Sequence, residues 1–195
     1  MTKILAFAGS SRKGSVNKKL VKIAAKAAEN AGATVTVTVI DLADYPMPIF
    51  NQDLEVEQGM PEQAREFKRL LIEHDGFLIA SPEYNSAFSP LLKNVIDWAS
   101  RAESKDEPPL QAYKGKFVSI MATSPGALGG LRGLVFLRML LANIGIIVLP
   151  EQIAIPQAFK AFSDDGTLVD KTQQQAVEQL GINLVQMLRN VHETT

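Results

Sequence analysis

Hydrophobic residues recur along the chain in two alternating patterns: short apolar runs, and longer segments with an apolar residue every three or four positions. Continuous apolar runs and period-of-two alternation are typical of strands, whereas the longer spacing is typical of helices. Strands are predicted at residues 3–8, 34–40, 76–81, 116–123 and 146–155. Helices are predicted at residues 15–31, from 61 to about 71, and at 89–101, 131–144 and 170–191.

This strand–helix alternation predicts an α/β fold, a doubly wound five-stranded parallel sheet with helices on both faces and right-handed crossovers. One domain over residues 1–195 is expected, with a long loop at 41–60. The segment 34–40 alternates Thr with Val, which leaves one face wetter and predicts a strand at the edge of the sheet. Such sheets bind ligands at the carboxyl ends of their strands. The loops after the first, third and fourth strands are therefore the candidate site.

The first loop combines small and hydroxyl residues with one arginine, G-S-S-R-K-G-S-V-N from Gly9 to Asn17, and leads into a helix. Free N–H groups and the dipole at a helix N-terminus attract anions. A nucleoside-triphosphate loop is excluded because no Lys follows Gly14, and the dinucleotide pattern G-x-G-x-x-G is absent. The loop suits a terminal phosphate monoester. The alternative is a well-capped helix with a flexible turn.

The other two loops are ambiguous when each is taken alone. Ser81-Pro82-Glu83-Tyr84-Asn85-Ser86 follows the third strand and can present main-chain groups to the edge of a planar heterocycle, with Tyr84 near its face. It can equally be a plain connection. The loop after the fourth strand begins at Ser124 and is rich in glycine, which permits close backbone approach to a ligand or simply a flexible link.

The amino-acid composition excludes several classes of function. With 20 Lys and Arg against 21 Asp and Glu, the net charge of −1 gives no field that favours nucleic acid. The absence of Cys excludes disulfides, Cys-ligated metals and a thiol nucleophile. No membrane-spanning or signal segment is recognised, so a cytoplasmic location is expected. His74 and His192 are expected at the surface, which leaves no metal site, and residues 103–107 form an acidic loop expected to be solvated.

Three motifs in this order, G-S-x-R-x-x-S-x-N, P-E-Y-N with a following L-K-N-x-x-D-W, and S-x-G-x-x-G-G-x-R, resemble the NADPH-dependent FMN reductase family. The resemblance runs from Lys3 to about Pro150 and implies a flavodoxin-like fold. It implies tightly but non-covalently bound FMN and an FMN-binding site made of Ser10, Arg12, Ser15, Val16, Asn17, Pro82, Glu83, Tyr84, Asn85, Ser124, Gly126 and Gly129. Two positions depart from the family pattern: Leu91, where Gly is usual, and Pro125 inside the glycine loop.

The resemblance implies an enzyme that takes hydride from NADPH or NADH and reduces a flavin, quinone or similar small acceptor by ping-pong transfer. No side chain need act as an acid or base, because the cofactor carries the chemistry. Two alternatives stay open: a flavodoxin-type electron carrier without its own nicotinamide oxidation, and a nucleotide-binding domain without flavin. A homodimer or homotetramer is expected, with the helix at 89–101 and its Trp98 at the interface.

Overall fold

The computed structural model describes residues 1–194 and contains a five-stranded sheet in the order β2-β1-β3-β6-β7, with every neighbouring pair parallel. Its strands are β1 (Thr2–Ala8), β2 (Val35–Val39), β3 (Gly76–Ala80), β6 (Phe117–Thr123) and β7 (Ile147–Ile155). The predicted edge position of the Thr/Val strand is confirmed, since β2 is the first strand in the order. Strand order reverses between β1 and β3, which is where such sheets bind ligands.

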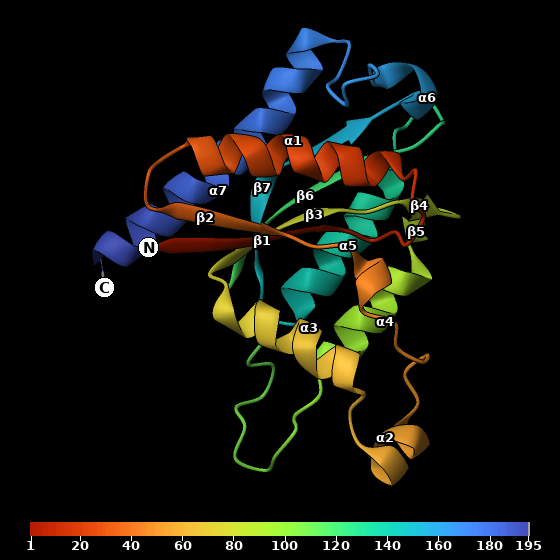
Figure 1. Cartoon of the computed structure of the whole chain (residues 1–195), viewed down its shortest axis with the longest axis vertical. Helices are drawn as coiled ribbons and strands as arrows, with labels where there is room; N and C mark the ends of the chain where they lie inside the picture. Colours follow the sequence, from red (N-terminus) through yellow and green to blue (C-terminus); the bar gives the residue numbers. More distant parts are fainter. Residues whose placement is uncertain (195) are drawn as a thin grey trace.

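Helices cover both faces of the sheet (Figure 1), which confirms the predicted doubly wound, flavodoxin-like architecture. One face carries α1 (Val16–Asn30) and α7 (Lys171–Thr194), and the other carries α3 (Glu62–Glu73), α4 (Pro90–Ala99) and α5 (Leu131–Asn143). Successive β1 side chains divide between the two cores because strand side chains alternate. Ile4, Ala6 and Ala8 pack toward α1 and α7, while Leu5 and Phe7 pack toward the other helices.

The close contact between α1 and α7 depends on Gly181. A Cβ at this position would lie 2.1 Å from the carbonyl oxygen of Ala24. We expect Gly181→Ala to lower the free energy of unfolding by about 2 kcal/mol, because overpacking outweighs alanine's better helix propensity. Thermal unfolding should show a midpoint about 4–8 °C lower. An unchanged midpoint would mean that α1 and α7 can separate freely.

Segments predicted as loops contain short elements. Within 41–60 the chain forms a 3₁₀ turn, η1 (Leu42–Asp44), and α2 (Gln52–Gln58). Further short elements are the hairpin β4 (Glu83–Tyr84) and β5 (Ala87–Phe88), and α6 (Ala158–Ala161). Helix α2 buries none of its residues, so it has no apolar stripe to detect. It is instead started by Asn51, whose side-chain oxygen accepts the N–H of Asp53 at 2.8 Å.

The prediction that Trp98 lies at a subunit interface is wrong, because its own chain covers it completely. Trp98 is fully buried and meets Phe50 edge-on, with 5.1 Å between the ring centroids. Its Nε1 donates to the carbonyl of Pro48 at 2.8 Å. Asn94, one turn earlier on α4, also holds this segment by accepting the N–H of Phe50. The segment 48–60 therefore folds back over α4.

The prediction that His74 is a surface residue is also wrong. His74 is buried, with Nδ1 2.6 Å from the carbonyl of Leu70 and Nε2 2.8 Å from the hydroxyl of Thr38. Both ring nitrogens are thus satisfied within the protein. His192, by contrast, has 45% of its side chain exposed, as predicted.

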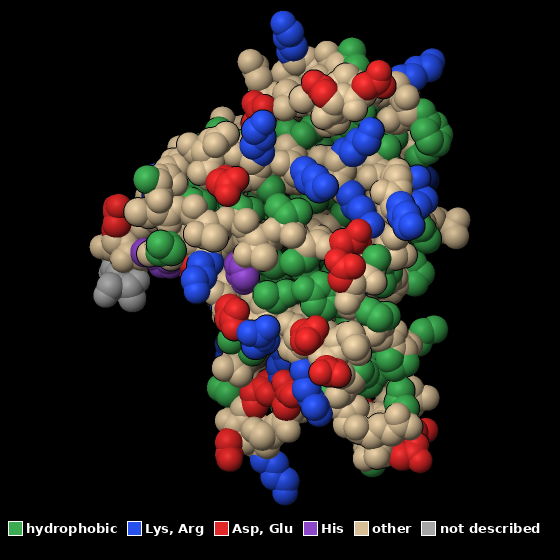
Figure 2. All heavy atoms as spheres, viewed as in Figure 1, with side chains coloured by type: hydrophobic (Ala, Val, Ile, Leu, Met, Phe, Trp, Pro, Cys, Tyr) green, Lys and Arg blue, Asp and Glu red, His purple; other side chains and the backbone are tan. Residues whose placement is uncertain are grey.

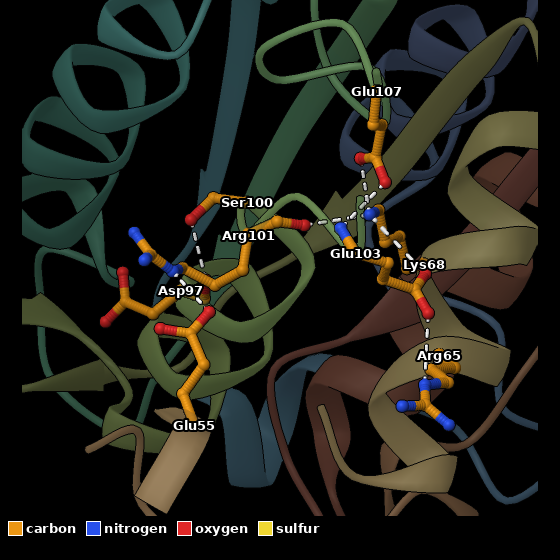
Figure 3. Close-up of polar contacts among 8 residues, drawn as sticks. All are labelled: Glu55, Arg65, Lys68, Asp97, Ser100, Arg101, Glu103 and Glu107. Atoms are coloured by element: carbon orange, nitrogen blue, oxygen red, sulfur yellow. Dashed lines mark hydrogen bonds and ion pairs between the residues drawn. The ribbon is translucent and has the colours of Figure 1, made fainter. Parts of the chain in front are cut away.

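The acidic loop is only partly solvated, because Glu107 pairs with the buried Lys68 (Figure 3). Lys68 Nζ donates to Glu107 and to the carbonyl of Arg101 at 2.8 Å, and Glu103 lies 3.5 Å away. Burial would raise the pKa of Glu107, but hydrogen bonds from the Glu103 N–H and from Lys68, together with the Lys68 charge, lower it below its usual value. The loop is therefore anchored by a buried cation.

Candidate functional site

The three loops singled out by the sequence lie together at the carboxyl edge of the sheet. The N–H of Gly9 donates to the carbonyl of Ala80 at 2.9 Å, and the N–H of Ser81 donates to that of Met121 at 2.8 Å. These bonds continue the parallel ladder from β1 to β3 and from β3 to β6 beyond the ends of the strands. The start of α1 and the β4–β5 hairpin lie at the same end of the sheet (Figure 1).

The N-terminus of α1 is open to an anion. Ser15 precedes the helix and is buried, but its side chain makes no capping hydrogen bond. Within residues 1–194 the N–H groups of Val16 and Asn17 have no acceptor, whereas the N–H of Lys18 bonds to the Ser15 carbonyl. Unpaired N–H groups at the positive end of a helix dipole bind phosphate well. The loop therefore fits a terminal phosphate.

Two side chains of the first loop lie close to this helix end. Arg12 is exposed and donates from Nη1 to the carbonyl of Gly14 at 2.8 Å, which folds its guanidinium over the loop. Ser10 is buried, and its hydroxyl accepts the N–H of Arg12 at 3.4 Å. A cation and hydroxyl groups thus border the free N–H groups of α1.

The Asn17 side chain is already paired and joins α1 to the end of β6. Its oxygen accepts the N–H of Thr123 and its NH₂ donates to the carbonyl of Thr123, both at 3.0 Å. The side chain is buried, so only its main-chain N–H is left for a ligand. Asn17 fixes the helix end relative to the third loop.

The second loop is a tight hairpin. Tyr84 pairs with Ala87, so Asn85 and Ser86 form a two-residue turn, with φ of 50° and 71° respectively. Positive φ at both positions matches the turn type that twists with a hairpin, at a strain of about 1–2 kcal/mol for each non-glycine residue. Pro82 is partly buried, while Tyr84 and Asn85 are exposed at the tip. An aromatic face and main-chain groups are thus presented to a ligand.

The Glu83 side chain points away from this tip, toward α5. One carboxylate oxygen accepts the N–H of Gly133 at 2.9 Å, and the other lies 3.2 Å from Arg132. Only 10% of the side chain is exposed. Its carboxylate is therefore used within the protein, which leaves the main-chain groups of Glu83 for the predicted heterocycle.

The third loop divides into an accessible part and a packed part. Gly126 is exposed and Ser124 partly buried, next to the free end of α1. Gly129 is buried at φ 62°, and a Cβ there would lie 2.5 Å from the carbonyl carbon of Ile155. Ser124 and Gly126 can thus face a ligand, whereas Gly129 packs the loop against the end of β7.

Lys18 and Asp41 flank the first loop and were not predicted from the sequence as part of the site. They form an ion pair beside a cleft of about 230 Å³ at the ends of β1 and β2. Burial would raise the pKa of Asp41, but hydrogen bonds from Lys18 and the Ala43 N–H, with the charges of Lys18 and Lys22, lower it. The signal in the sequence was an acidic residue directly after a strand.

Within residues 1–194, no group of three or more His, Asp or Glu side chains is arranged to hold a metal ion. No helix in this part of the chain is long and apolar enough to span a membrane.

Comparisons with known proteins agree on one family. A sequence model of NADPH-dependent FMN reductases matches residues 2–160. The NAD(P)H-dependent FMN reductase PA1204 of Pseudomonas aeruginosa is 33% identical, over 91% of this chain and 90% of that protein. A probable NADPH:quinone oxidoreductase of Oryza sativa is 31% identical, over 93% and 86%. The solved structure of FerB, a flavoenzyme NAD(P)H:(acceptor) oxidoreductase from Paracoccus denitrificans, superposes with a TM-score of 0.80 at 27% identity, over 97% and 98%.

Proposed function

The chain belongs to the NADPH-dependent FMN reductase family, and we propose that it uses one non-covalently bound FMN, held at the carboxyl edge of its sheet, to oxidise NADPH or NADH. Quinones are the acceptors we favour, because quinone reductases recur among its relatives. The observation that carries the FMN site is the open N-terminus of α1, with its free N–H groups at the meeting point of the three loops.

Each part of the edge has a role in this proposal. The N–H groups of Val16 and Asn17, with Ser10, Ser15 and Arg12, hold the phosphate. Main-chain groups of Pro82, Glu83 and Asn85 border the ring, with Tyr84 at its face and Ser124 and Gly126 on the other side. The buried Gly129 holds the loop of Ser124 and Gly126 against the end of β7. When bound, FMN supplies hydride transfer between the nicotinamide and the acceptor. The protein contributes position and exclusion of water.

Reconstitution tests this proposal directly. Protein stripped of flavin and titrated with FMN should become yellow with one FMN per chain, and should then consume NADPH when a quinone is added. Failure to bind FMN would refute the proposed site.

We place this activity in the cytoplasm, where reduced nicotinamides are supplied.

The charge distribution favours the enzyme over an electron carrier. Lys and Arg side chains gather over α1 (Figure 2), which carries Lys18, Lys19, Lys22 and Lys26 and a single acidic residue, Glu29. A basic surface beside the site raises the local concentration of an anionic nicotinamide. The purified protein, tested without any partner protein, should oxidise NADPH if it is an enzyme and should not oxidise it if it is only an electron carrier.

We expect the nicotinamide and the acceptor to occupy one place in turn, which gives ping-pong kinetics. Hydride transfer requires the reacting atoms at about 3–3.5 Å, so the donor ring excludes the acceptor while it reacts. Initial rates measured against both substrates should give parallel double-reciprocal lines, with inhibition at high acceptor concentration. Intersecting lines would require a second nicotinamide site.

We also propose a homo-oligomer, in which a second copy of the chain packs on α5 rather than on the predicted helix at 89–101. Most apolar residues of that helix, α4, are buried within their own chain, Trp98 among them. Leu131, Val135, Phe136 and Met139 expose an apolar face along α5. Beside it, Ala87, Phe88 and Phe136 line a cleft of about 410 Å³ that adjoins the hairpin. A second copy on this face would wall the open side of the site.

A charge placed on the α5 face should separate the copies, because a two-fold interface receives it twice. Val135→Asp should be monomeric by light scattering at micromolar concentration, where the wild type is at least dimeric. Val56→Asp is the matched control, since Val56 is exposed on α2, away from this face. A monomeric wild type would contradict the interface.

A further inference from the structure

We propose that Glu83 is a positioning residue: its carboxylate clamps the β4–β5 hairpin to the first turn of α5 and thereby holds residues 84 and 85 in place for the FMN ring. The inference deepens the proposed function and rests on it for its FMN part. The clamp itself rests on contacts within this chain.

Helix α5 cannot cap its own N-terminus. Its N-cap is Gly130, which has no side chain and sits at φ 95°. The N–H of Gly133, in the first turn, instead donates to Glu83 at 2.9 Å, while Arg132 Nη2 lies 3.2 Å from the other carboxylate oxygen. A carboxylate is favoured at the positive end of a helix dipole. Glu83 therefore supplies the missing cap from a different part of the chain.

Glycines allow the helix to reach the hairpin. A Cβ on Gly133 would lie 3.2 Å from the carbonyl oxygen of Ala87 and 3.4 Å from the Cβ of Glu83. A Cβ on Gly130 would lie 2.7 Å from that of Ala122 in β6. Gly133 thus makes room for the hairpin and for Glu83, and Gly130 lets the start of α5 approach β6.

The hairpin has few restraints of its own. Its strands contain two residues each, with only two cross-strand pairs. Asn85 and Ser86 both hold positive φ, a conformation that side chains other than glycine adopt rarely. A hairpin of this size is at best marginally stable alone. The conformation of the turn therefore depends on anchors outside the hairpin, which are the Glu83 carboxylate and the packing of Phe88 against the core.

Hydrogen–deuterium exchange of the FMN-free protein tests the clamp without any reference to activity. In Glu83→Ala we expect the amides of residues 84–88 to exchange at least about tenfold faster than in the wild type. Glu83→Gln, which keeps an acceptor for Gly133 but loses the charge, should fall between the two. Glu62→Ala, at an exposed carboxylate in the first turn of α3, is the matched control and should match the wild type.

FMN binding then tests the positioning role. The dissociation constant should rise about tenfold or more in Glu83→Ala, less in Glu83→Gln, and stay unchanged in Glu62→Ala. The visible spectrum of bound FMN should change in the same order, which a remote loss of stability does not produce. If Glu83→Ala fails to fold, the comparison of Glu83→Gln with the wild type decides the result.

Two results would overturn the proposal. If the hairpin of a folded Glu83 variant exchanged at the wild-type rate, the clamp would be refuted. If exchange were faster but FMN affinity and the FMN spectrum were unchanged, the positioning role would be refuted. Wild-type protein that takes up no FMN would refute the proposed function instead, and the exchange rates would still decide the clamp.

Discussion

Replacing Arg12 with alanine is expected to weaken FMN binding about 10- to 150-fold, the effect of losing one charge-assisted hydrogen bond to a phosphate. Arg12 lies in the first loop, and its guanidinium donates to the carbonyl of Gly14, which directly precedes the N-cap residue Ser15 of α1. Its loss should leave the free energy of unfolding of the FMN-free protein nearly unchanged, because the side chain is exposed. Fluorescence titration with FMN measures the change.

Lys13→Ala is the matched control for this experiment. Lys13 is also exposed and adjacent, and an exposed cation is worth at most about fivefold in affinity. Equal FMN affinity of the Arg12 variant and the wild type would show that Arg12 does not contribute to FMN binding. A loss of the same size in both variants would indicate that only the general charge of the loop matters.

Replacing Lys68 with methionine is expected to lower the free energy of unfolding by about 3 kcal/mol at neutral pH. Lys68 is buried and Glu107 largely so, and removing one partner of a buried pair leaves the other charge uncompensated. The midpoint of thermal unfolding should fall by about 6–12 °C. Glu107→Gln added to the same variant should recover part of the loss, because the carboxylate charge is then gone.

The pH dependence of this pair has a definite sign. The folded protein lowers the pKa of Glu107, so its contribution to stability is present above the unfolded pKa and is lost as pH falls through the folded pKa. The difference in free energy of unfolding between the wild type and Lys68→Met should therefore be largest near neutral pH and should decrease in acid. A difference that is constant with pH would show that the pair contributes only by packing.

The sheet and its ligand edge follow from local patterns in the sequence. Five apolar runs of strand length and the Thr/Val alternation of residues 34–40 were enough to predict the strands and the edge position of β2, because side-chain period reports burial directly. Gly9 and Ser81 end strands that are neighbours in the sheet, so their loops had to meet. The family also followed from motifs within these loops.

The contacts that complete the site depend on residues far apart in the sequence. Asn17 is 106 positions from Thr123, and Glu83 is 50 from Gly133, so no local pattern distinguishes a paired amide or carboxylate from one that faces a ligand. Trp98 and His74 were misplaced for the same reason. Trp98 is covered by a segment about 50 residues earlier, and His74 is satisfied partly by Thr38.

An anaerobic titration tests the central claim, that FMN at this edge connects NAD(P)H to an acceptor, most directly. FMN is first added to the flavin-free protein until one equivalent is bound, and NADPH is then added without an acceptor. We expect the yellow absorbance to disappear with one equivalent of NADPH and to return fully when one equivalent of a quinone is added. Persistent yellow colour in the presence of excess NADPH and NADH would contradict the account.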